Sequence, residues 1–366
     1  MKAGKLSQTV WTRSVQKQLN HDGTHFLLKP SKEEMCTAMH VPAKRIALTA
    51  SACVSGHAVS IGGYGAAKAV NDLAARGAEP TGIAVQMLLP IQMEEEGLKE
   101  AIWHIERLCR KLQIQIAEIQ VENTPAVSQI VVEVTALGTV EEEGLICPAD
   151  AGPGQDIVLC GYIGLEGMLR ILDECEEELA GRFSPGFLRQ MRAMEGEILR
   201  LDAIRSAWNY RNISLKTDNP DSGRLSGNRV TAIQQIGSGG IFGTLWELAE
   251  AAGIGLEVDL KKMSILQETV EVCEYFHLNP YQMTSTGAVL MLTEHGGRLV
   301  QSLREGGVRA SMLGVTDAGS ARVITSEGEK RFLDRPAPDE LMRWWEERAG
   351  KVIAHGGLYA VSNHKI

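Results

Sequence analysis

A short segment rich in proline and glycine divides the chain and limits what it can fold into. Residues 147–154 read CPADAGPG, with two prolines and two glycines. Such a run favours turns and interrupts regular elements. At roughly 150 residues per domain, a chain of 366 residues is expected to form two domains. We therefore predict domains at 1–150 and 151–340, followed by a terminal helix and tail at 341–366.

Both halves alternate strand-like and helix-like patterns, which predicts a mixed α/β fold. In the first half we expect strands at 45–50, 83–89, 114–121 and 129–138, and helices at 66–76 and 97–113. In the second half we expect strands at 156–160, 229–236, 255–260 and 308–315, and helices within 166–208, 243–252, 266–275, 297–305 and 337–350. The polar segment 214–228 is expected to be a loop, and Gly56, Gly62, Gly63 and Gly65 to form a turn before the helix at 66–76.

Charge and composition exclude several classes of protein. Lys and Arg number 37 against 46 Asp and Glu, a formal net charge of −9. A nucleic-acid partner or an anionic lipid surface would need a basic footprint instead. The seven cysteines form no C-x-x-C pair, which argues against a zinc site or a disulfide framework. No apolar run approaches the ~20 residues of a spanning helix, and the start lacks a secretory signal. We expect a cytoplasmic protein that binds neither nucleic acid nor membrane.

The pair Asn71-Asp72 lies inside an otherwise apolar helical segment, GAAKAVNDLAARG. Both residues are poor helix-interior residues, because their side chains compete for the backbone. A buried carboxylate is costly unless it is paired or bound to a cation. Asp72 therefore either points at a metal or ligand, or forms a structural pair with Lys68 at i−4 or part of a solvated stripe.

A second glycine-rich turn separates a predicted strand from a predicted helix at Gln235–Trp246, QIGSGGIFGTLW. Free N–H groups and the positive end of a helix dipole hold phosphate in such turns. The segment is not a Walker A loop, since no Gly-Lys-Ser/Thr follows, and it misses G-x-G-x-x-G because Phe242 occupies the last position. It binds an anion, or it is a tight strand-to-helix turn.

Glu118 and Glu122 lie on one predicted strand, with Gln120 between them on the same face. That face could help bind a cation, or it could simply contact water.

The motifs together resemble one known family. Asn71–Pro80, NDLAARGAEP, resembles the N-D-x-x-x-x-G-A-x-P signature of the aminoimidazole ribonucleotide synthase superfamily. Gly4–Leu6 resembles the opening G-K-L of its hydrogenase-maturation carbamoyl dehydratase branch. Further segments follow in the family's order: Gly161–Gly167, Gly239-Gly240 leading to Leu245–Ala249, Asn279-Pro280 and Ser285–Leu290. The resemblance covers roughly residues 1–340.

The resemblance implies a fold, a cofactor and a site. The N-terminal domain would join a partner's strands in a barrel across a homodimer, and the C-terminal α/β domain would close over ATP. Family members hold Mg²⁺ on the triphosphate with acidic residues and pass the γ-phosphate to an oxygen of a small substrate. The expected nucleotide-binding residues are Asn71, Asp72, Glu122, Gly237, Ser238, Gly239 and Gly240, with Asp72 and Glu122 as metal ligands. No catalytic residue is assigned.

The sequence departs from the family at its acidic motifs. Ser31–Cys36 replaces G-x-D-A, Ser51 replaces the Asp of the T-T-D step, and Gln234–Gly240 replaces H-D-x-T-x-G-G and loses both His and Asp. Gln120–Asn123 stands where G-H-T-E or G-D-T is usual and keeps only Glu122. These losses leave limited support for ATP with Mg²⁺ and speak against a two-metal site. The carbamoyl dehydratase also carries a C-terminal cysteine, whereas the last cysteine here is Cys273, so that reaction is not expected.

Two hypotheses follow. In the first, the chain is an ATP-dependent enzyme with an altered metal site that acts on a small carbonyl-type or phosphate-accepting substrate. In the second, it is a pseudoenzyme, a dimeric binding or maturation subunit with a protein partner. The concentration of losses in the acidic motifs leans slightly toward the second.

Overall fold

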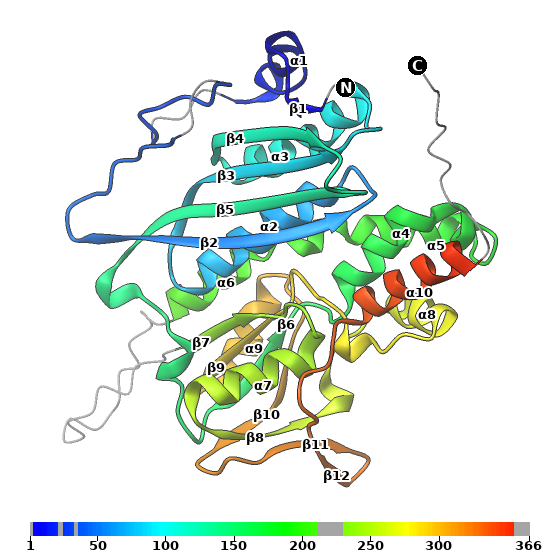
Figure 1. Cartoon of the computed structure of the whole chain (residues 1–366). Coiled ribbons are helices and arrows are strands. Elements are labelled where there is room, and N and C mark those ends of the chain that lie inside the picture. Colours follow the sequence, from blue (N-terminus) through cyan, green and yellow to red (C-terminus); the bar gives the residue numbers. More distant parts are fainter. Residues whose placement is uncertain (1–2, 21–24, 33–35, 211–229, 355–366) are drawn as a thin grey trace.

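The computed structural model of the chain describes residues 3–20, 25–32, 36–210 and 230–354. Two separate sheets dominate it, one above the other in Figure 1, and helices fill the space between and beside them. The first sheet uses strands before residue 142 and the second uses strands after residue 155. The mixed α/β fold is as the sequence predicts.

The first sheet has five strands in the order β1-β4-β3-β5-β2. β3 and β4 run parallel, and the other neighbours are antiparallel. Two helices, α2 and α3, lie behind this sheet in Figure 1, and none of the described helices covers its other face. The bounds are β1 (Gly4–Lys5), β2 (Arg45–Gly56), β3 (Glu79–Pro90), β4 (Gln115–Thr124), β5 (Ile130–Glu141), α1 (Gln8–Ser14), η1 (Gln16–Gln18), α2 (Ile61–Ala75), α3 (Glu95–Leu112) and η2 (Glu142–Gly144).

The second sheet has seven strands in the order β12-β11-β8-β10-β6-β9-β7. All its neighbouring strands are antiparallel except β8 and β11. Its strands and the helices that follow them are η3 (Pro148–Asp150), β6 (Asp156–Cys160), β7 (Val230–Gln235), α7 (Gly240–Ala252), β8 (Gly255–Asp259), η5 (Leu260–Lys262), β9 (Val289–Thr293), α9 (Gly296–Glu305), β10 (Ala310–Asp317), β11 (Arg322–Ser326) and β12 (Glu329–Phe332).

The remaining helices form a group beside the two sheets, mostly to the right in Figure 1. They are α4 (Leu165–Ala180), α5 (Pro185–Ala193), η4 (Met194–Ile198), α6 (Leu201–Tyr210), α8 (Gln267–Phe276), η6 (Pro280–Gln282) and α10 (Glu340–Ala354). α10 packs on this group through Trp345, whose indole donates to Glu174 of α4 at 2.8 Å. None of the described helices is long and apolar enough to cross a membrane.

The helix α2 is the centre of the molecule. It contacts β2 and β5 of the first sheet, and also β7 of the second. It starts at Ile61, earlier than predicted, because Gly62 and Gly65 lie in the helix and not in a turn before it. Both glycines allow close packing: a Cβ at Gly62 would lie 2.6 Å from the Ile105 side chain, and one at Gly65 would lie 2.9 Å from Val54.

Other differences from the predicted elements are local. The predicted helical stretch 166–208 is three helices, α4, α5 and α6, separated by short turns. Strands β1, β9, β11 and β12 were not predicted. The predicted loop at 214–228 and the tail beyond residue 354 lie outside the described residues. The barrel across a dimer stays a prediction, since one chain is described.

Candidate functional site

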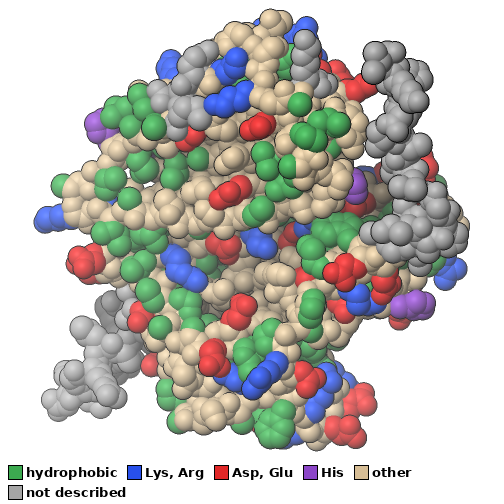
Figure 2. Space-filling view, viewed as in Figure 1, with side chains coloured by type: hydrophobic (Ala, Val, Ile, Leu, Met, Phe, Trp, Pro, Cys, Tyr) green, Lys and Arg blue, Asp and Glu red, His purple; other side chains and the backbone are tan. Residues whose placement is uncertain are grey.

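The pair Asn71-Asp72 of α2 faces the second sheet. Lys68, Asn71 and Asp72 share one side of the helix, because positions i, i+3 and i+4 are neighbours on a helix surface. Opposite them β7 ends at Gln235, and the glycine turn Gly237–Gly240 leads into α7. Figure 2 shows the molecule hollowed at this level, between the upper part built on the first sheet and the lower part built on the second.

Asn71 is fully buried and joins the two halves of the chain. Its amide nitrogen donates to the carbonyl oxygen of Ile198 at 2.8 Å and to Oε1 of Gln235 at 2.9 Å. Its side-chain oxygen accepts from the backbone N–H of Arg200 at 2.9 Å. With 0% exposure and these three bonds, Asn71 is placed as a structural link and has no surface for a ligand.

Gln235 also forms hydrogen bonds to Lys68 and Asp72 of α2. Its amide nitrogen donates to Oδ1 of Asp72 at 2.8 Å and to the carbonyl oxygen of Lys68 at 3.1 Å. Burial raises the pKa of Asp72 to about 6, although Lys68, the Gln235 bond and Arg76 all act in the opposite direction. Asp72 is thus a carboxylate whose pKa lies close to neutral pH; its hydrogen-bond partner is an amide, and the charge of Glu166 adds to the rise in its pKa.

Lys68 lies at the mouth of the glycine turn. A Cβ placed on Gly237 would lie 4.0 Å from the Lys68 ammonium nitrogen, and apart from the adjoining residues no other described atom would lie nearer. Lys68 forms no ion pair within 4.0 Å among the residues that the structure describes. Its positive charge acts to lower the pKa of Asp72, Glu166 and Asp339, although burial raises the pKa of Asp72 and Asp339 overall. A cation with no direct partner therefore faces the turn.

Two backbone N–H groups of the glycine turn are bonded within the protein, and two are open to a ligand. The N–H of Gly239 donates to Oδ2 of Asp339 at 2.8 Å, and that of Gly240 to the carbonyl oxygen of Gly237 at 3.1 Å. Within the described part of the chain, the N–H groups of Gly237 and Ser238 have no acceptor, and Ser238 is exposed. An incoming anion would therefore meet the first two residues of the turn, since Asp339 already occupies the third.

Glu166 is a buried charge beneath this site. Burial would raise its pKa, but Lys68, Arg170 and the hydroxyl groups of Thr284 and Thr286 outweigh burial and hold the pKa at about 2. The hydroxyl donors lie 2.6 and 2.7 Å from Oε2, and Arg170 lies 3.1 Å from Oε1. Glu166 remains ionised and balances the cations of the site.

Glu122 is not part of this arrangement. It is exposed on β4, whereas its neighbours Val121 and Asn123 are buried. Because side chains alternate along a strand, Glu122 points to the open face of the first sheet, away from α2. The structure does not bring Asp72 and Glu122 together within one chain.

The two acids predicted as Mg²⁺ ligands, Asp72 and Glu122, do not lie together in the described part of one chain. Among the described residues, no group of three His, Cys, Asp or Glu side chains could hold a metal ion. One oxygen of Asp72 accepts from the Gln235 amide, an uncharged donor in the place of the family's lost Asp. The cationic group of the site is Lys68.

Three residues of the site were not predicted as functional. Lys68 was considered only as a structural partner of Asp72, although its i−4 position was visible in the sequence. Gln235 was counted as the loss of an acid, and its two donor bonds could not be foreseen. Asp339 reaches the glycine turn from a hundred residues away in the chain, and its only signal was its place in the first turn of the helix predicted at 337–350.

Comparison with known proteins gives two domain matches. Residues 34–140 match the family model described as "AIR synthase related protein, N-terminal domain", and residues 217–326 match its C-terminal domain. Together the two matched ranges span more than half of the chain.

Individual relatives are more distant. A putative hydrogenase expression/formation protein of Methanocaldococcus jannaschii is 22% identical over 309 residues, which are 79% of this chain and 83% of that protein. Carbamoyl dehydratase HypE of Azotobacter vinelandii is 22% identical over 93% of both chains. Escherichia coli HypE has a similar structure, with a TM-score of 0.68 and 17% identity over 92% of this chain and all of that one. A structure of HypE in complex with ATP has a TM-score of 0.62 and 15% identity, over 85% and 90% of the two chains.

Proposed function

The chain belongs to the AIR synthase related protein family, and on that premise we propose that it is a hydrogenase-maturation-like protein that binds ATP between α2 and the glycine turn. The γ-phosphoryl group would pass to an oxygen of a small carbonyl-type or phosphate-accepting substrate, with ADP as the leaving product. The observation that carries the proposal is the convergence of the unpaired Lys68 ammonium and the open N–H groups of Gly237 and Ser238 on one space.

These groups suit phosphate chemically. Backbone N–H groups at the start of a helix and a lysine ammonium are the donors that commonly hold phosphate oxygens. The backbone of α2 is fixed at Lys68, because the Lys68 carbonyl oxygen accepts from the Gln235 amide of β7. In this proposal Lys68 neutralises phosphate charge where the family uses acid-bound metal.

The structure of a HypE protein with ATP has this fold and supports the assignment of a nucleotide. A structure of AaThiL complexed with AMPPCP and TMP has the same fold, at a TM-score of 0.60 and 14% identity. The alternative of a pseudoenzyme is not favoured by relatives of this kind, although the lost acidic motifs leaned toward it.

The test is calorimetric titration of the purified protein with ATP, with excess Mg²⁺ and again with EDTA. We expect saturable binding in both conditions, weakened about ten-fold or more by Lys68→Met, since a charged hydrogen bond contributes ~1.5–3 kcal/mol. Lys262→Met is the matched control, because Lys262 is exposed on η5. If folded protein gives no heat of binding at millimolar ATP, nucleotide binding is refuted and the non-catalytic hypothesis is restored.

We also propose that the open face of the first sheet pairs with a second copy of the chain. That face presents small side chains from β2, among them Ala47, Thr49 and Ser51, all exposed. Ser51 and Thr135 of the neighbouring β5 lie 2.7 Å apart through their hydroxyl oxygens. Light scattering should give the mass of a dimer, and Ser51→Arg should give a monomer with unchanged far-UV circular dichroism. A wild-type monomer would refute the pairing.

A protein partner is a further part of the proposal. A structure named as a HypE–HypF complex has this fold, with a TM-score of 0.63 and 17% identity over 81% of this chain. Co-purification with a maturation protein from the same source would test it, and failure of the two purified proteins to associate would contradict it.

A further inference from the structure

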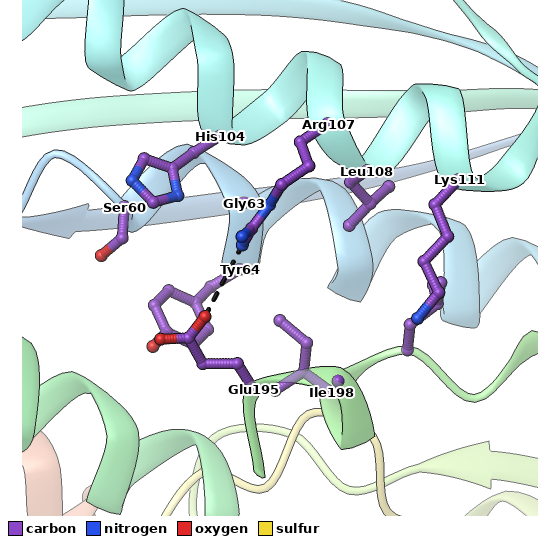
Figure 3. Close-up of a pocket in the computed structure, with 11 residues that line it drawn as sticks. Ser60, Gly63, Tyr64, His104, Arg107, Leu108, Lys111, Glu195 and Ile198 are labelled. Carbon is purple, nitrogen blue, oxygen red and sulfur yellow. Dashed lines mark ion pairs between the residues drawn. The ribbon is translucent and has the colours of Figure 1, made fainter. Parts of the chain in front are cut away.

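A second hollow lies between α2, α3 and η4, and none of Lys68, Asp72 or Gly237 lines it. Its volume is about 310 Å³, and both halves of the chain supply its walls. This volume is at the lower end of the range for small-molecule sites. Figure 3 shows the lining side chains converging on it from α3 above and from η4 below.

One wall is a basic stripe on α3. His104, Arg107 and Lys111 follow one another at spacings of three and four residues, so they share a face of the helix. Burial, and then the charge of Arg107, lowers the pKa of His104, which favours a neutral ring able to hydrogen-bond. Lys111 has no ion-pair partner among the residues that the structure describes.

The facing wall carries a single acid. Glu195 of η4 approaches Arg107 across the hollow, with 3.6 Å between their charged atoms. Both side chains are partly exposed, 34% for Glu195 and 53% for Arg107, so the pair is worth little and is easily opened. The cations Arg107 and Lys111 therefore face the single carboxylate of Glu195.

The start of α2 forms the back of the hollow. The hydroxyl groups of Ser60 and Tyr64 both donate to Asp173, at 2.6 and 2.9 Å, and Arg192 pairs with the same carboxylate at 2.8 Å. These three bonds fix the wall, and Asp173 itself does not line the hollow. Gly63 leaves space, since a Cβ there would find only His104, at 3.8 Å or more.

We propose that this hollow is a binding site for a small organic phosphate monoester. Its anion would lie between Arg107 and Lys111 and displace Glu195 from Arg107, and its apolar body would contact Leu108, Ile198 and Leu199. The excess of positive charge selects an anion, and the apolar side chains select an organic ester over free phosphate. The site is separate from the nucleotide cleft and does not depend on it.

Phenyl phosphate is a suitable probe, measured by calorimetry against inorganic phosphate and benzyl alcohol. We expect saturable binding of phenyl phosphate, weaker binding of inorganic phosphate and none of benzyl alcohol. Lys111→Ala should weaken phenyl phosphate binding about ten-fold, and Lys99→Ala on the same helix should not, because Lys99 lies outside the lining. Gly63→Leu should block binding without removing a charge.

The outcomes separate this site from the cleft and from a chance anion. Binding that survives Gly63→Leu, or that disappears in Lys68→Met, would overturn the proposal. Equal affinity for inorganic phosphate and phenyl phosphate would overturn the claim that the site selects an organic ester. The proposal is supported if Gly63→Leu and Lys111→Ala lose phenyl phosphate binding while Lys99→Ala and Lys68→Met keep wild-type affinity. All four variants should have the wild-type Tm.

Discussion

Asp339 accepts a hydrogen bond from the backbone N–H of Gly239, so that a carboxylate of the chain itself lies at the start of α7. Its other oxygen accepts from the N–H of Leu341 at 2.9 Å and caps the start of α10. One side chain thereby ties the C-terminal helix to the turn that the sequence marks as an anion site, and limits the space for a ligand there to the first residues of the turn.

Asp339→Ala should destabilise the fold by about 2 kcal/mol, because a buried N–H loses its acceptor and a helix loses its cap. Urea unfolding followed by circular dichroism measures this change. Asp334→Ala, at an exposed position in the same segment, is the control and should change little. Equal stability of the two variants would show that the Asp339 bonds contribute nothing net.

Asp72→Asn should stabilise the protein at pH 7.5. The native pKa of about 6 lies above the ordinary 3.8, so the folded state holds the proton more tightly and stability falls as the pH rises between these values. The full shift corresponds to up to about 3 kcal/mol. The Asn side chain keeps the acceptor for Gln235 and has no charge to bury.

The pH dependence is the discriminating measurement for this substitution. The gain should be present above pH 6 and vanish below pH 4, in urea unfolding across that range. Asp202→Asn, at an exposed side chain, controls for the change in net charge. A variant less stable than wild type at pH 7.5 would mean that the ionised bond to Gln235 outweighs burial.

Gly240→Ala should cost much more stability than Gly253→Ala. Both glycines have a φ of +65°, so both substitutions carry the same left-handed strain of about 1–2 kcal/mol. A Cβ at Gly240 would lie 2.4 Å from the carbonyl oxygen of Tyr281, whereas a Cβ at Gly253 would have no described atom within 4 Å. Thermal melts of the two variants give the difference directly, and equal Tm values would refute the close approach.

Glu166→Ala should lower the free energy of unfolding by about 3–5 kcal/mol, because Arg170 would keep a buried charge without its counter-ion. Glu178→Ala on the same helix is the matched control: its partner Arg348 is 41% exposed, and exposed pairs contribute ~0–1 kcal/mol. Since the pKa of Glu166 is held at about 2, its contribution should be present above pH 4.5 and be lost as the pH falls toward 2. Similar losses for both variants would contradict this account.

Most of the fold could be predicted from local patterns, and the site only in part. The periodicity of residues 97–113 predicts α3, which the structure contains, and the segment 147–154 lies between β5 and β6. The glycines 62, 63 and 65 were misread as a turn, because all three lie inside α2. Gly62 lets α2 approach α3 and Gly65 lets it approach β2, and no local pattern reports such a neighbour.

The site needs contacts between residues far apart in the chain. Asn71 and Asp72 were identified, but their common partner is Gln235, 164 residues after Asn71. The pairing of Asp72 with Glu122 was inferred from a family pattern, and alternation along β4 turns Glu122 to the other face of the sheet. Sequence could name the groups and could not place them.

The shared position of α2 has a consequence for any attempt to dissect the molecule. Its Arg76 donates to the carbonyl oxygen of Ile233 at 2.7 Å, and Trp208 donates to that of Ala74 at 3.1 Å, besides the bonds of Asn71. Expressed alone, residues 1–150 would expose this polar side of α2, and the remainder would lose the partner of β7. The two halves are separate in sequence and in sheet, yet they should unfold in a single cooperative transition, so neither is a transferable module.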